Sequence, residues 1–398
     1  MTLKINKIES IVIFLLVASQ ISTYTIFTLL FPMNDSILQI FKYLCIFLPI
    51  IYLFKGFKIE IKMLFVILVF LTSILINDID PKFNSEIRFI TWIVMIAMIG
   101  PLFYSYHLNL FKEKLLDTFM YVFMILGGIS FIYWALGFPS LGRGHFSGLF
   151  GHSMVLAPIS SMGVLYSIYK FYKSETIFFK YFYLILFLSN FLALVLSASR
   201  SALVAVLIAL FIFLIFAKLR YKKFFLFFGV LLGVITNSLI SLNLEKSNLT
   251  QSIATRGFDN TREILWHDRL LEFKNSPFFG VGFAAQDDKI DGKIGKIGSE
   301  EGVIEPGSTY LMILSMTGLL GTISIMIFFS SYIKNLKFWR NNLLKINYKI
   351  LLLIFFIIHF IAEGYIFSSG SVFAFIFWLL IAVTYPNQYN NLEEGIVK

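Results

Sequence analysis

The sequence predicts an all-α polytopic membrane protein with about twelve transmembrane helices and one large loop. The chain of 398 residues is 58% hydrophobic and 14% charged, whereas about 25% of the residues in a typical soluble domain are charged. Its mean hydropathy is +0.82. Apolar runs of about 20 residues, the length that crosses a bilayer, recur along the whole chain. These observations exclude a soluble domain and make the lipid bilayer the first expected partner.

Twelve apolar stretches are expected to be spans, and they cover residues 11–31, 37–54, 61–77, 87–104, 115–138, 153–172, 177–197, 201–217, 224–242, 308–333, 348–368 and 370–386. The first is longer than the apolar core of a signal peptide, so we expect a retained helix. The chain then divides into three parts: residues 1–242 with nine helices, a polar loop over residues 243–307, and residues 308–398 with three helices and a short tail.

The basic residues predict the orientation of these spans. Twenty of the 33 lysines and arginines fall at the two termini and in connections that would all lie on one side of the membrane. The positive-inside rule makes that side cytoplasmic, with both termini inside and the large loop outside. This placement accounts for the net charge of +10, so a nucleic-acid partner is not expected. The single cysteine, Cys45, excludes an intramolecular disulfide and a cysteine-based metal site.

The arginines are distributed differently from the lysines. Of the eight arginines, six are expected on the outer side: Arg88, Arg143, Arg200, Arg256, Arg262 and Arg269. Arginine presents a planar fork that binds phosphate or carboxylate bidentately. We therefore expect an anionic ligand at the outer face. The alternative is ordinary ion pairing with Asp80, Glu86 or Asp259.

Within the large loop, a short amphipathic helix is expected after the cap residue Asn260, ending at about Lys274. Helical spacing places three of its side chains on one face: Arg262, Trp266 and Arg269. This face could meet the ligand, or the helix could rest at the membrane interface with tryptophan as its anchor. The following glycine-rich segment, residues 277–282, is interpreted as a tight turn because no strand precedes it.

Polar residues also interrupt the apolar stretches. Arg200 lies in a serine-rich break at residues 197–201, and His152 begins a predicted span. In the eleventh span, His359 and Glu363 lie one helical turn apart. A carboxylate inside a membrane helix is a functional candidate, with a structural partner for an outer arginine as the alternative.

Four segments together resemble the Wzy-type polysaccharide polymerases and the related O-antigen ligases: residues 146–152, residues 197–201, residues 262–282 and residues 307–321. The resemblance implies a bacterial inner-membrane glycosyltransferase with a GT-C-like helical fold, acting in O-antigen, lipopolysaccharide or capsule synthesis. Its implied substrates are undecaprenyl-diphosphate-linked oligosaccharides, joined on the periplasmic face with release of undecaprenyl diphosphate. A chain-length regulator protein is a candidate partner.

The implied diphosphate ligands are Arg200, Arg262 and Arg269, with Arg143 and Arg256 in support. Positioned guanidinium groups stabilise the charge on a leaving diphosphate, so neither a metal ion nor another cofactor is expected. Substrate contacts are expected from His152, Trp266 and Tyr310, of which the last two could instead anchor the loop.

The resemblance alone does not distinguish a polymerase from a ligase. Ligases of this superfamily usually carry a histidine just before the helix that follows the large loop, and residues 305–309 contain none. This departure favours a polymerase and makes Glu305 or Glu363 the candidate catalytic base. A lipid-linked oligosaccharide flippase or other transporter is the alternative from another class. Such transporters usually show two similar halves, which the expected nine-plus-three division lacks.

Overall fold

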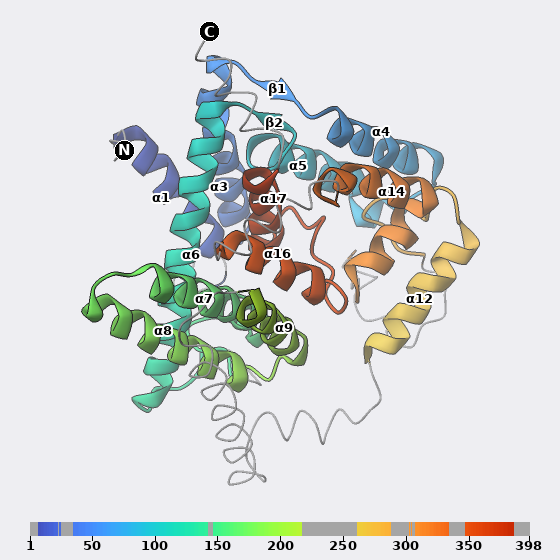
Figure 1. Ribbon diagram of the computed structural model, residues 1–398. Coiled ribbons are helices and arrows are strands. Elements are labelled where there is room, and N and C mark those ends of the chain that lie inside the picture. The colour runs from blue at the N-terminus through green and yellow to red at the C-terminus, as the bar shows by residue number, and fades with distance from the viewer. Residues whose placement is uncertain are drawn as a thin grey trace.

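The computed structural model describes residues 7–22, 24, 35–141, 146–216, 261–287, 302, 304, 307–333 and 347–385. Over these residues the chain is mainly helical (Figure 1). In chain order the elements are α1 (Lys7–Ser22), α3 (Asp35–Phe47), the 3-10 helix η1 (Leu48–Lys55), β1 (Lys58–Ile59), α4 (Ile61–Ile76), η2 (Pro81–Phe83), α5 (Ser85–Met98), β2 (Phe103–Tyr104), α6 (Tyr106–Ala135), α7 (Ser153–Lys173), α8 (Ile177–Leu196), α9 (Arg200–Phe216), α12 (Thr261–Asn275), α14 (Thr309–Ile333), α16 (Tyr348–His359) and α17 (Val372–Thr384).

These helices confirm a multi-pass membrane protein. Five of the described segments are long and apolar enough to cross a bilayer: Ile37–Phe54, Tyr106–Ala135, Ser153–Lys173, Ile177–Leu196 and Thr309–Ser331. Helices overlap eleven of the twelve predicted spans. The twelfth, residues 224–242, lies outside the described residues, so the full count stays a prediction.

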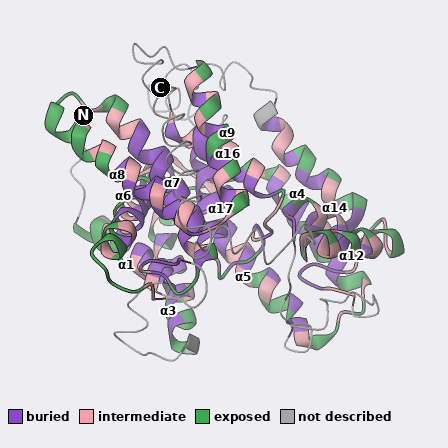
Figure 2. Ribbon diagram, turned by 90° about the horizontal axis from the view of Figure 1, so that it is seen from below, coloured by how far each residue is buried: buried purple, intermediate pink, exposed green. Residues whose placement is uncertain are grey.

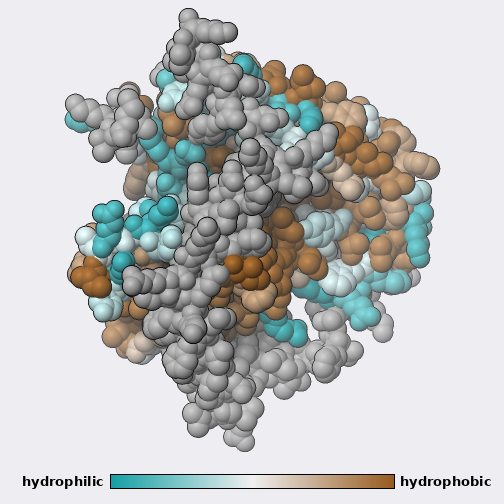
Figure 3. Space-filling view, in the orientation of Figure 1, coloured by the Kyte–Doolittle hydropathy of each residue, from teal (hydrophilic) through white to brown (hydrophobic). Residues whose placement is uncertain are grey.

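Burial distinguishes central helices from peripheral ones. Every residue of α17 is buried, as expected for a helix that is apolar all round. In contrast, α4 buries one face through Met63 and Phe70 and exposes Leu68 and Leu75 on the other. Figure 2 shows the buried residues gathered around α7 and α17, with α12 at the margin. Figure 3 shows hydrophobic side chains over α4 and α14, as a lipid-facing surface requires, and hydrophilic ones near α12.

Contacts between distant segments fall into two sets at opposite ends of the helices. One set holds the β1–β2 pair and the ion pairs Glu9–Lys114 and Glu113–Lys349, at 2.9 and 2.6 Å. The other includes the bond from the Gly151 N–H to the Tyr24 carbonyl oxygen, at 3.2 Å. Each set joins ends that the sequence predicts on the same side of the membrane. Which side faces the cytoplasm stays a prediction.

The predicted tight turn at residues 277–282 is confirmed, and it docks on a break in α14. At Gly318 the backbone leaves the helical conformation, with φ 63° and ψ −161°. The Leu319 N–H donates to the Pro277 carbonyl oxygen at 2.8 Å, and the Val281 N–H donates to the Ser315 carbonyl oxygen at 2.9 Å. The turn therefore satisfies backbone groups around the break. The loop helix that precedes it, α12, also agrees with the prediction.

An aromatic cluster holds the segment after this turn in the protein interior. Phe283 is fully buried and lies 5.2–5.6 Å, between ring centroids, from Phe70, Phe89, Trp92 and Phe367. These partners come from α4, α5 and the segment before α17. The large loop is thus fixed to the helical core through the segment that follows α12.

The predicted end of the eleventh span is wrong. The helix α16 ends at His359, and residues 360–371 connect it to α17 without forming a helix. Two glycines and three serines in this stretch lower its helix propensity. Its backbone groups instead bond to neighbouring elements, as described below. We call residues 360–371 the α16–α17 connection.

Candidate active site

The α16–α17 connection is the meeting point of several helix ends. At its start, the Thr309 N–H donates to the carbonyl oxygens of Phe360 and Glu363, both at 3.0 Å. At its end, the Thr91 and Ser369 hydroxyl groups bond at 2.7 Å. Elements from both halves of the chain therefore hold this stretch in place.

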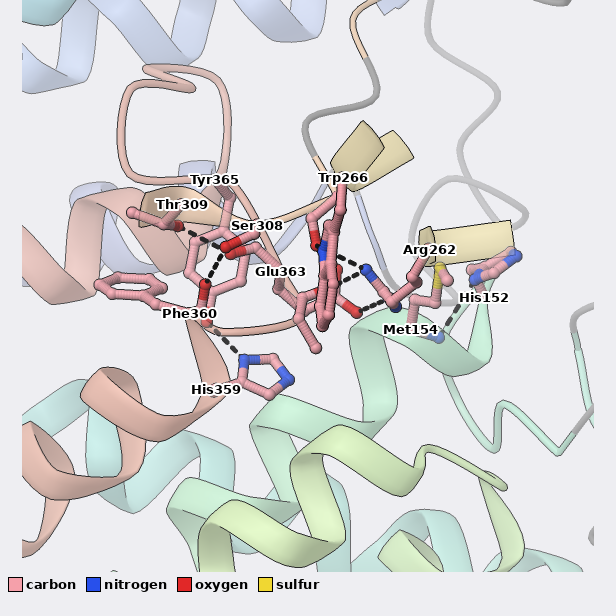
Figure 4. Close-up of polar contacts among 12 residues, drawn as sticks. His152, Met154, Arg262, Trp266, Ser308, Thr309, His359, Phe360, Glu363 and Tyr365 are labelled. Carbon is pink, nitrogen blue, oxygen red and sulfur yellow. Dashed lines mark hydrogen bonds and ion pairs between the residues drawn. The ribbon is translucent and has the colours of Figure 1, made fainter. Parts of the chain in front are cut away.

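Arg262, at the start of α12, binds the first part of the connection (Figure 4). Its Nη2 forms an ion pair with Glu363 Oε1, and its Nη1 donates to the carbonyl oxygens of Ala362 and, at 3.2 Å, Gly307. The two charged side chains remain 27% and 24% exposed. A guanidinium group has five N–H donors, so these three bonds to described residues leave two donors for a further acceptor. The structure thus combines a fixed cation, a carboxylate and two N–H donors that bond to none of the described residues.

Trp266 fixes the same region one turn later in α12. Its Nε1 donates to the Gly307 carbonyl oxygen at 3.2 Å, the acceptor that Arg262 also uses. Gly307 has φ +67°, and a Cβ there would lie 2.8 Å from Leu265 Cβ. The close approach of α12 to residue 307 therefore requires glycine. This contact supports the anchoring interpretation of Trp266.

A histidine–tyrosine pair lies beside the ion pair and was not proposed as part of a site from the sequence. His359 Nδ1 and the Tyr365 hydroxyl are 2.8 Å apart (Figure 4). The His359 ring stacks on Phe355 with 5.1 Å between centroids and is 2% exposed. The sequence placed His359 one turn before Glu363 but carried no signal for Tyr365, because the chain leaves the helix between them.

Arg269 takes a different position from Arg262, although both lie on α12. Its side chain is 3% exposed and pairs with Glu272 at 2.7 Å. Glu272 also accepts from the Asp287 N–H at 3.0 Å, and Arg269 donates to Gln286 Oε1 at 3.3 Å. Burial raises the pKa of the Glu272 carboxyl above its ordinary value, against the opposing effects of Arg269 and the Asp287 N–H. This geometry supports a structural role, tying α12 to the segment after the turn.

The remaining predicted site residues are spread over several helix ends. Arg200 is exposed at the first position of α9, after a reversal at Ala198 with φ 59°. Tyr310 is 46% exposed, and its hydroxyl donates to the Ile357 carbonyl oxygen at 2.7 Å. His152 is exposed and caps α7, its Nδ1 accepting from the Met154 N–H at 3.1 Å (Figure 4). Three predicted residues lie outside the described part of the chain: Arg143, Arg256 and Glu305.

Among the described residues, no three histidine, cysteine, aspartate or glutamate side chains gather closely enough to hold a metal ion. The single cysteine, Cys45, is buried with a free thiol.

The fold and this site define a multi-pass membrane protein with an arginine–carboxylate pair at one end of its helices. Residues 183–326 match the model of the family described as O-antigen ligase. The matched segment runs from α8 into α14 and contains Arg200, Arg262 and the docked turn. It confirms the resemblance to the O-antigen ligase/polymerase superfamily, a group related to membrane glycosyl transfer. A search of curated proteins found no match.

Proposed function

We propose that the protein polymerises lipid-diphosphate-linked oligosaccharide repeat units at the outer face of the bacterial inner membrane. A hydroxyl group of one repeat unit attacks the anomeric carbon of another and forms the new glycosidic bond. The bond from that carbon to the diphosphate oxygen breaks, and its electron pair leaves with undecaprenyl diphosphate. The proton of the attacking hydroxyl passes to a base.

The Arg262–Glu363 pair is the observation that carries this proposal. The two N–H donors of Arg262 that bond to no described residue would bind the diphosphate and stabilise the charge that develops as it leaves. The Glu363 carboxylate would accept the proton of the attacking hydroxyl. Because both side chains are about one-quarter exposed, they remain accessible to a substrate.

Arg200 is the second cation that the proposal assigns to the diphosphate. It lies at the amino terminus of α9, where the helix dipole adds partial positive charge. The helix α9 packs against α16, which carries the connection to Glu363. The internal ion pair of Arg269 gives no comparable support, so we leave Arg269 out of the proposed ligand set.

The choice of polymerase over ligase follows from the start of α14. Residues 305–309 contain no histidine, whereas the ligases resembled here usually carry one at this place. Glu363 would supply the base in its stead. A ligase would transfer the glycan once to a different acceptor and give a single product.

The test uses purified protein in detergent with one undecaprenyl-diphosphate-linked repeat unit and EDTA. The wild type is expected to give a ladder that grows with time while undecaprenyl diphosphate is released. Replacing Arg262 with alanine should lower the rate by about 10²–10³-fold, the cost of removing one donor to a developing oxyanion. Glu363→Gln should also slow the reaction, because the amide cannot take the proton.

Lys349→Ala is the matched control, since it breaks the Glu113–Lys349 ion pair at the other end of the helices. It should leave the ladder nearly unchanged. A full ladder from a normally expressed Arg262→Ala protein would refute the role of this pair. A single transferred product would favour the ligase, and movement of lipid-linked sugar between leaflets without a ladder would favour a transporter.

A further inference from the structure

Two further cations lie near the other end of the α16–α17 connection. Lys42 of α3 is 2% exposed, and its Nζ donates to the Gly370 carbonyl oxygen at 2.5 Å. Arg88 of α5 is half-buried, and its Nη2 donates to the Gly302 carbonyl oxygen at 2.8 Å. Both cations thus bind neutral carbonyl groups. Within the described residues, no ion pair joins either of them to a carboxylate.

The helices that carry the two cations both contact one short piece of backbone, Ser369–Gly370, through Lys42 and Thr91. Thr91, one turn after Arg88 in α5, bonds to Ser369 at 2.7 Å. Arg88 also lies close enough to the Tyr43 phenol for the two to interact electrostatically. The Tyr43 hydroxyl in turn lies 3.8 Å from the Cβ position of Gly370. The helices α3 and α5 pack together and bring these groups to one place.

Hydroxyl groups also contact this piece of backbone, and one of these contacts is exposed to solvent. The Tyr24 hydroxyl donates to the Gly370 carbonyl oxygen at 3.2 Å, and this contact is exposed. The Lys42 ammonium group lies 5.2 Å from the centroid of the Tyr24 ring. Because Gly370 is exposed while the lysine bonded to it is buried, a ligand that reached Gly370 would lie beside the Lys42 ammonium group and the hydroxyl groups of Tyr24 and Tyr43. Arg88 would approach the same ligand from the Tyr43 side.

A buried cation without a counter-ion is costly, and an arriving anion would repay part of that cost. Two cations on different helices suit a ligand with two charged groups, such as a diphosphate, better than a single carboxylate. This cluster and the Arg262–Glu363 pair are held at the two ends of the same connection. They are therefore separate positions that one reaction could use together.

We infer that Lys42 and Arg88 form a second anion site, which binds the diphosphate of the acceptor lipid while Arg262 binds that of the donor. The inference rests on the proposed polymerase function, in which both reactants carry a lipid diphosphate. A site of this kind holds the acceptor in position without taking part in bond breaking. It also gives a polymerase a means of selecting lipid-linked acceptors.

The test compares two acceptors in one transfer assay with the same lipid-linked donor. One acceptor is a lipid-diphosphate-linked repeat unit blocked against use as a donor, and the other is an alkyl glycoside of that repeat unit without diphosphate. Lys42→Gln and Arg88→Gln should each raise KM for the diphosphate acceptor by about tenfold to a hundredfold, the value of a charge-assisted hydrogen bond. KM for the alkyl glycoside should not change.

Two further variants separate binding from folding. Arg88→Lys keeps the charge and should restore part of the lost affinity. Lys112→Gln is the matched control, because Lys112 is also fully buried and bonded to two carbonyl oxygens, those of Gly100 and Phe103. Its substitution should affect both acceptors equally. Equal loss with both acceptors in the Lys42 and Arg88 variants, or no loss in stable variants, would overturn the inference.

Anionic phospholipid carries similar phosphate chemistry, so the assay is repeated with added phosphatidylglycerol. If this lipid acts through Lys42 and Arg88 while their variants bind the diphosphate acceptor normally, the site is a headgroup site and the inference is wrong. Failure of the wild type to transfer to either acceptor would instead count against the proposed function.

Discussion

The two arginines described on α12 show how burial changes the role of one residue type. The sequence placed Arg262 and Arg269 on the same helical face, and both were expected to bind diphosphate. In the structure, Arg262 is part-exposed and keeps donors that bond to no described residue, whereas Arg269 is 3% exposed in a pair with Glu272. Substitution of the two residues should therefore affect different properties of the protein.

Arg269→Met should destabilise the fold by about 3–5 kcal/mol, because it leaves Glu272 as a buried carboxylate without its main partner. The double variant Arg269→Met with Glu272→Met should recover most of that loss, since no unpaired charge remains. Thermal unfolding in detergent measures both effects.

Activity of the double variant separates the structural role from the predicted ligand role. A stable double variant with a wild-type ladder identifies Arg269 as structural. If the stable double variant loses the ladder, Arg269 contributes to substrate binding as the sequence predicted.

Among the elements, the turn at residues 277–282 and the break in α14 form one unit. The backbones approach so closely that a Cβ at Gly280 would lie 2.3 Å from the Met316 carbonyl carbon, and one at Gly318 would lie 2.4 Å from that of Phe278. Both glycines have positive φ, at 70° and 63°. The glycine in each segment thus allows the backbone of the other segment to approach closely.

Gly280→Ala and Gly318→Ala should each destabilise the protein by at least about 1–3 kcal/mol, the cost of holding a non-glycine residue in such a conformation. The clash with backbone atoms adds to this cost. Gly151→Ala is the control, because a Cβ there has no neighbour within 4 Å. Melting temperatures that fall equally for all three variants would contradict the close approach.

The sequence predicted these elements better than it predicted their contacts. Long apolar runs define helices locally, so α7 and α8 agree with the expected spans to within one residue at each end. The break at Gly318 and the early end of α16 depend on partners distant in the chain. Arg262 and Glu363 are 101 positions apart, and no local pattern shows that they meet.

For the site, residue chemistry was predictable and spatial grouping was not. An arginine on the outer side of the membrane and a carboxylate inside a predicted membrane helix are both unusual. Each therefore indicated either a functional site or an ion pair. The structure brings Arg262 and Glu363 together, which realises the ion-pair alternative for both. Arg88 was expected to bind an anionic ligand or to pair with a carboxylate, and Lys42 carried no prediction. Both bind backbone carbonyl groups instead, which every sequence offers at all positions.

At the scale of the whole molecule, the proposed reaction depends on orientation. The ends that carry Arg262, Glu363, Lys42 and Arg88 must face the compartment that holds the lipid-linked oligosaccharides. The structure groups these ends together, and the lysine distribution predicts that they face outward. A labelling experiment can therefore test the topology independently of the chemistry.

The buried Cys45 allows a simple design, in which Cys45→Ser provides a cysteine-free background. Glu175→Cys labels the connection between α7 and α8, where Lys170 and Lys173 predict the cytoplasmic side. Phe138→Cys labels the segment after α6, on the expected outer side, where this side chain is 49% exposed. An impermeant maleimide should label only the second variant in intact spheroplasts and only the first in inside-out vesicles.

Labelling of both variants from the same side would show that α7 does not cross the membrane. The reverse pattern would keep the fold but place the Arg262–Glu363 pair in the cytoplasm, where polymerisation on the outer face is impossible.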